Sequence, residues 1–119
     1  MFQMGGVGPM FGQLGFFTKF GGKDFEDKRP QERYVAESTR LLKVLDQRLA
    51  GREWMMGGEY TIADMAIFPW VSCLVDFYGA GELVGMADYQ NVTRVLAAFM
   101  ARPAVQRGML VPQRPAVTA

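Results

Sequence analysis

Three cationic side chains surround the start of one predicted helix, and their types and spacing are suited to binding an anion. They are Lys28, Arg29 and Arg33, on either side of Pro30. Helix N-termini bind carboxylates and phosphates because their first N–H groups have no partner within the helix. The same stretch also carries carboxylates that can neutralise these cations: Asp24, Glu26, Asp27 and Glu32. The sequence therefore leaves two interpretations open, an anion site and a solvated charged turn.

The rest of the sequence offers little nucleophilic or metal chemistry. Histidine is absent, and Cys73 is the single cysteine. Serine–histidine and cysteine–histidine pairs are therefore excluded within this chain, and we expect no metal site. Cys73 lies among apolar neighbours with no adjacent base, so we interpret it as an inert core thiol. One cysteine also excludes an internal disulfide and fits a reducing, cytoplasmic compartment.

Composition indicates one folded domain with no charged-polymer or membrane partner. The 119 residues are 50% hydrophobic and carry a formal net charge of +1. We therefore expect neither nucleic acid nor a membrane surface as a partner. The uncharged stretch 65–75 is shorter than the ~20 residues that a membrane span needs. We expect residues 1–110 to form the domain and residues 111–119, with two prolines, a flexible tail.

Helical spacing of apolar residues recurs along the chain and predicts the elements that position the cations. Residues 30–50 read as an amphipathic helix with its leucines on one face. Residues 61–78 are apolar on all sides, which is typical of a buried central helix, although Pro69 should bend it. A third helix fits residues 90–102, followed by a short turn at 104–107. The fold class is therefore all-α, an orthogonal helical bundle.

Glycines interrupt the apolar residues at the start of the chain. We predict a poor helix to about residue 13 and then a long loop to residue 29. Phe16, Phe17 and Phe20 fall in this predicted loop. They are candidates to line an apolar pocket, or they are loop side chains that pack on the core.

A capping box precedes the predicted central helix. Thr61 can accept a hydrogen bond from the Asp64 N–H, while the Asp64 carboxylate accepts one from the Thr61 N–H. Tyr60 and Met65 stand at the two positions of a hydrophobic staple. We interpret these four residues as structural rather than catalytic, and expect loss of the cap to cost about 1–2 kcal/mol.

Several of these motifs together resemble one family. The stretch 59–70, EYTIADMAIFPW, and the stretch 102–108, RPAVQRG, are similar to the C-terminal helical domain of glutathione transferases. Residues 3–13, QMGGVGPMFGQ, and the Glu32-Arg33-Tyr34 segment resemble the bacterial Nu class, whose members reduce disulfides with glutathione. The resemblance implies that glutathione is a ligand, that Arg33 contacts it, and that Phe16, Phe17 and Phe20 border the hydrophobic substrate site. It also implies a homo-oligomer that forms partly through the first two helices.

Members of that family carry a thioredoxin-like domain ahead of the helical one, and it has no counterpart in this sequence. By the resemblance, the chain begins within the first helix of the helical domain. We therefore expect it to be the helical half of a glutathione-dependent transferase or disulfide-bond oxidoreductase, inactive alone. The alternative is a non-catalytic helical binding or assembly module.

Overall fold

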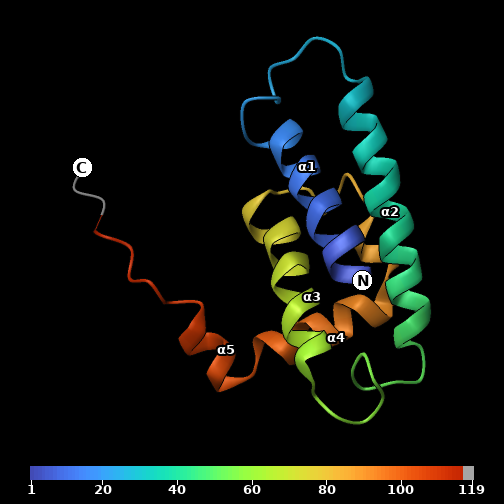
Figure 1. The fold of residues 1–119 in the computed structure, drawn as a ribbon, viewed down its shortest axis with the longest axis vertical. Coiled ribbons are helices and arrows are strands. Elements are labelled where there is room, and N and C mark those ends of the chain that lie inside the picture. Colours follow the sequence, from blue (N-terminus) through green and yellow to red (C-terminus); the bar gives the residue numbers. More distant parts are fainter. Residues whose placement is uncertain (117–119) are drawn as a thin grey trace.

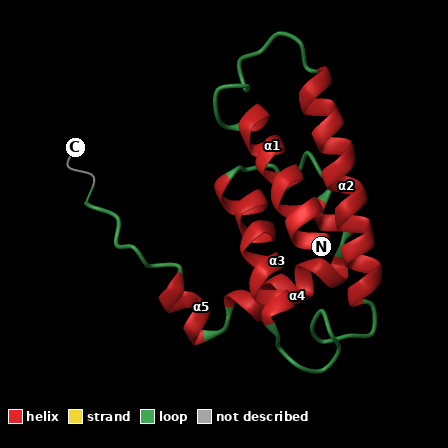
Figure 2. Ribbon diagram, viewed as in Figure 1, coloured by secondary structure: helices red, strands yellow, loops and turns green. Residues whose placement is uncertain are grey.

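Four helices build the bundle: α1 (Gly8–Thr18), α2 (Arg29–Leu49), α3 (Ile62–Ser72) and α4 (Gln90–Met100). A π-helical segment, η1 (Phe2–Val7), leads into α1, and a second, η2 (Cys73–Phe77), continues α3. A short 3₁₀ turn, η3 (Met86–Asp88), precedes α4, and α5 (Pro103–Gly108) follows it. The structure, a computed structural model, describes residues 1–116, and these contain helices and loops but no strand (Figure 2).

The helices pack in the crossed arrangement that the sequence predicts. In Figure 1, α1 lies between α2 and α3, α4 crosses near one end of the bundle, and α5 stands to one side. Each long helix contributes one buried face to a single core. Its buried members include Phe11, Leu14, Leu42, Leu45, Leu49, Phe68, Val71, Leu74, Val92, Val95 and Phe99. The all-α orthogonal bundle is thus confirmed.

Most predicted helix limits are also confirmed. The helix predicted at 30–50 is α2, that at 61–78 is α3 with η2, and that at 90–102 is α4. The short turn predicted at 104–107 is α5. Residues 111–116 are exposed and lack a helix, and the remainder of the predicted tail, 117–119, lies outside the described residues. A flexible tail stays a prediction.

The first helix is longer than predicted. It does not end near residue 13 but continues to Thr18, so the predicted loop is shorter. One of its glycines serves close packing, because a methyl group added at Gly15 would lie 2.5 Å from the Tyr78 ring. The helical cost of Gly15 is offset by this close approach of α1 to the residue that ends η2.

The start of α3 is fixed by the predicted capping box. The Asp64 carboxylate is fully buried, and its Oδ2 accepts from the Thr61 N–H at 3.0 Å. Thr61 Oγ1 accepts from the Ala63 N–H at 3.3 Å. Asp64 Oδ1 has a further, unpredicted partner, the Met55 N–H at 2.9 Å. Asp64 therefore caps α3 and also holds the preceding loop against it.

The expectation that α3 is buried on every side is wrong. Its position is central, between α1 and α4, but Ile62 and Met65 are 80% and 49% exposed. Within residues 1–116, the helices therefore leave one apolar side of α3, an apolar stripe, open. Tyr60 and Met65 line one groove beside this stripe. Their staple contact stays a prediction.

Contacts between distant segments complete the ends of α2 and α4. Asp46 Oδ1, on α2, accepts from the N–H groups of Asn91 and Val92 at 2.9 and 3.1 Å and so caps α4. In return, Arg94 donates to the Leu49 carbonyl oxygen at the end of α2 at 3.0 Å. These reciprocal caps join the two helices by polar contacts as well as by packing.

No helix within residues 1–116 has the combination of length and apolar character that a bilayer crossing requires.

Replacing Asp64 with alanine is expected to lower the free energy of unfolding by about 3–5 kcal/mol. The reason is that two N–H groups, one buried and one part-buried, lose a charged acceptor, and each such hydrogen bond is worth ~1.5–3 kcal/mol. Urea denaturation followed by circular dichroism measures the change. Glu59→Ala, an exposed carboxylate without a hydrogen bond in the described structure, is the matched control and should have little effect. A loss of 1 kcal/mol or less for Asp64→Ala, at the low end of a simple cap, would contradict the dual role.

Candidate functional site

An open groove of about 520 Å³ lies between α1 and the first turns of α2. It is lined by two of the predicted cations, Arg29 and Arg33, and by one of the predicted phenylalanines, Phe17. The full lining is Gln13, Phe17, Asp27, Arg29, Pro30, Arg33 and Tyr34. Because Pro30 occupies the first turn of α2, as predicted, it fixes the point where the chain turns into the groove wall.

Two of the three predicted cations are held by neighbours within the turn. The Arg29 guanidinium forms two-pronged contacts of 2.7–3.1 Å with the Asp27 carboxylate. The hydrogen bond from Arg29 lowers the pKa of Asp27. Lys28 Nζ donates to the Lys23 carbonyl oxygen at 2.9 Å. The charged-turn interpretation therefore describes Arg29 and Lys28.

Arg33 differs from both. It is exposed, and it forms no hydrogen bond or ion pair with any residue in the described range. The carboxylate one turn further along α2, Glu37, is occupied by Arg40 at 2.7 and 2.9 Å. The hydrogen bond from Arg40 also lowers the pKa of Glu37. Pairing elsewhere in the helix thus leaves the Arg33 guanidinium available to an external anion.

An aromatic pair forms the apolar wall of the groove. The rings of Phe17 and Tyr34 are stacked, with centroids 5.8 Å apart and planes inclined by 14°. Gln31 Nε2 donates to the Phe17 carbonyl oxygen at 3.3 Å and ties α2 to the end of α1. The groove therefore places a free guanidinium beside a flat aromatic surface.

The structure separates the three candidate phenylalanines. Phe16 packs edge-on against Phe17, at 4.9 Å, but does not line the groove. Phe20 lies further away, with its ring 6.0 Å from Phe77 and 6.1 Å from Tyr78. Both Phe16 and Phe20 are exposed on the outer surface, so only Phe17 shares a groove with Arg33.

Sequence reasoning missed two groove residues, Gln13 and Tyr34. Tyr34 falls on the apolar face of α2 and therefore reads as a core residue, although it is only half-buried. Gln13 lies at the predicted end of a poor helix, where no pattern marks it as a groove residue. The continuation of α1 beyond Gln13 places Phe17 in the same groove as both residues.

Cys73 is half-buried rather than enclosed in the core. It lies one turn beyond Pro69, at the end of the exposed side of α3. Among the described residues, no three histidine, cysteine, aspartate or glutamate side chains are grouped to hold a metal ion. Nearby, burial raises the pKa of Tyr78 to about 12, and the Cys73 thiol adds to this shift.

The model of the family "Glutathione S-transferase, C-terminal domain" matches residues 8–103. The chain belongs to this family. It is 38% identical to the disulfide-bond oxidoreductase YghU of Escherichia coli over 114 residues, which cover 93% of this chain and 39% of the relative.

Solved glutathione transferases are also similar to this chain. One from Burkholderia graminis, with two glutathione molecules bound per subunit, is 68% identical and has a TM-score of 0.94 over 97% of this chain. One from Pseudomonas putida, with one glutathione disulfide bound per subunit, is 62% identical and has a TM-score of 0.91 over 94% of this chain. This glutathione transferase helical domain spans 48% of each of those chains, about half their length.

The melting temperature is expected to fall between pH 10 and pH 12, and part of this fall should be absent in Tyr78→Phe. The folded pKa lies above the ordinary value of 10.0, so the neutral phenol is favoured by folding. That contribution is complete below pH 10 and is lost as the pH rises through 12. Thermal unfolding followed at both pH values measures it. If the melting temperatures of the two proteins fell by the same amount between pH 10 and pH 12, the raised pKa of Tyr78 would be contradicted.

Proposed function

We propose that this chain is the helical half of a glutathione-dependent transferase or disulfide-bond oxidoreductase, and that its Arg33 groove holds part of the glutathione. The observation that carries the proposal is the free guanidinium of Arg33 beside the Phe17–Tyr34 stack. Glutathione carries carboxylates at both ends, and a planar guanidinium binds a carboxylate through two parallel hydrogen bonds.

The aromatic wall suits the remainder of such a ligand. Phe17 and Tyr34 offer an apolar face to a disulfide or to an apolar group joined to the glutathione sulfur. Phe16 and Phe20 lie beyond the groove and are proposed as contacts for a larger apolar substrate. The relatives solved with glutathione or its disulfide support the choice of ligand.

The chemical step is proposed to belong to the part of the relatives that this chain does not cover. In this proposal a thioredoxin-like domain activates the glutathione sulfur, and the helical half alone has no transferase activity. A homo-oligomer and a cytoplasmic location complete the proposal. The alternative is a helical binding or assembly module without catalysis.

Calorimetric titration with glutathione and with glutathione disulfide tests the Arg33 groove. The chain is expected to bind one of them with a Kd of about 1 mM or lower. Arg33→Ala should weaken binding at least about tenfold, because a hydrogen bond to a charged group is worth ~1.5–3 kcal/mol. Arg33→Lys should restore only part of the loss, since a lysine lacks the two-pronged geometry.

Lys43→Ala is the matched control, because it removes an exposed cation from the same helix that does not line the Arg33 groove and forms no hydrogen bond in the described structure. It should bind as the unchanged chain does. Equal binding by Arg33→Ala, or no heat from a chain that circular dichroism shows to be folded, would overturn the proposed site. The second outcome would favour the assembly module.

A further inference from the structure

The Arg33 groove contains a second guanidinium that a neighbour within the chain already occupies. Its lining includes Arg29 and Arg33 and, among the residues that the structure describes, one carboxylate, that of Asp27. The two arginines are four positions apart on α2, so they are neighbours on one face of the helix. Arg29 is paired with Asp27, and this pairing leaves Arg33 alone to meet an external anion.

Asp27 engages Arg29 with both carboxylate oxygens. Oδ1 accepts from the Arg29 backbone N–H at 3.0 Å and from its Nε at 2.9 Å. Oδ2 accepts from Nε at 3.1 Å and from Nη2 at 2.7 Å. This edge of a guanidinium is one that binds a carboxylate through two parallel hydrogen bonds. Asp27 therefore occupies the donors of Arg29 that a ligand carboxylate would use.

The pair forms readily and breaks readily. The two residues are two positions apart, so the Asp27 carboxylate is an intramolecular partner at high effective concentration. Both side chains are open to water, with 87% of Arg29 and 50% of Asp27 exposed. An exposed ion pair of this kind contributes little to stability. Asp27 is therefore suited to compete with a ligand for Arg29 rather than to hold the fold together.

We propose that Asp27 is a specificity-determining residue of the groove: it withholds Arg29 and repels further negative charge, so that the groove accepts a single carboxylate on Arg33. The inference rests on the proposed function, in which glutathione supplies that carboxylate. Glutathione carries its carboxylates at opposite ends, so one free guanidinium suits either end. A ligand with two adjacent carboxylates needs Arg29 as well, and Asp27 disfavours it.

Rapidly reversible binding fits the proposed function. A disulfide-bond oxidoreductase that uses glutathione takes up glutathione and releases glutathione disulfide in each cycle. Product release limits the rate of many enzymes. By lowering the affinity of the groove for a carboxylate, Asp27 favours that release.

Asp27→Asn tests the inference. Asparagine keeps an oxygen that can accept from the Arg29 N–H at the start of α2, but it loses the negative charge and the two-pronged contact. In calorimetric titration, the Kd for glutathione should fall about three- to tenfold, because one repulsive charge is removed and Arg29 is released. A purely structural role for Asp27 predicts no gain in binding.

Arg29→Gln, added to Asp27→Asn, tests whether the released guanidinium causes the gain. The double variant leaves Arg33 as the single charged group of the groove lining, so the Kd should return to within about twofold of that of the unchanged chain.

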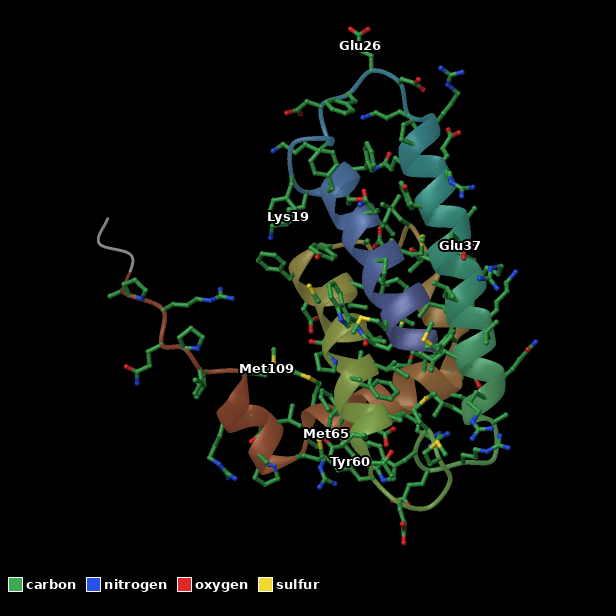
Figure 3. The ribbon with its side chains drawn as sticks, viewed as in Figure 1. Lys19, Glu26, Glu37, Tyr60, Met65 and Met109 are labelled. Atoms are coloured by element: carbon green, nitrogen blue, oxygen red, sulfur yellow. The ribbon has the colours of Figure 1, made fainter. Side chains whose placement is uncertain are left out.

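Glu26→Gln is the matched control, because it removes the same charge from the neighbouring position and Glu26 does not line the groove. Figure 3 shows Glu26 at the tip of the loop between α1 and α2, with its side chain pointing away from the bundle. Its charge is screened by water and salt, so the Kd should change by less than about twofold.

Acetate and malonate, which carry one and two adjacent carboxylates, test the specificity without glutathione. Binding is followed at constant ionic strength by the NMR signals of the Nε groups of Arg29 and Arg33. Asp27→Asn should raise the ratio of malonate affinity to acetate affinity at least about threefold, since malonate can engage both guanidiniums.

The inference is overturned if Asp27→Asn gives no gain in glutathione binding, whether or not the unchanged chain binds glutathione. A gain that persists in the double variant, or an unchanged ratio of malonate to acetate affinity, would overturn it equally. Failure of the proposed function is a separate result, because it is read from Arg33→Ala in a chain that keeps Asp27.

Discussion

The fold depends on one buried carboxylate, that of Asp64. Its two oxygens hold the backbone N–H groups of Thr61 and Met55, so the first turn of α3 and the loop before it share one acceptor. The Met55 carbonyl oxygen in turn accepts from Arg48 Nε at 2.9 Å, which connects the same loop to α2. The backbone of a single residue, Met55, thereby connects the end of α2 to the start of α3, and the Trp54 and Met55 side chains are buried in the core.

The candidate site depends on a second constraint, the close approach of α1 to its neighbours. Gly15 allows the Tyr78 ring to lie against the α1 backbone, and this contact lets α1 continue past the point where its glycines would otherwise end it. The additional turn carries Phe17 to the wall that Tyr34 completes. The packing of Tyr78 on Gly15 thus determines where α1 places Phe17 in the groove.

Local patterns allowed the sequence to predict α2, α3, α4 and the capping box, because each depends on residues within a few positions of one another. The length of α1 could not be predicted in this way, since the reason for Gly15 lies in Tyr78, far along the chain. Arg33 was identified by resemblance, but its freedom from neighbours follows from the pairing of Arg40 with Glu37. The sequence does not predict the exposed side of α3. Apolar spacing shows that a helix face is suited to packing, but it does not show whether another segment of the chain packs on that face.

The cap of α4 has a consequence for the order in which the chain folds. Asp46 and Asn91 are 45 positions apart, so the N-terminus of α4 has no side-chain cap from its own segment. An 11-residue helix is marginal by itself in water, and one without a local cap is weaker still. α4 therefore becomes a stable helix only once α2 is present to receive it. The two behave as one cooperative unit, in which hydrogen exchange from either reports the opening of both.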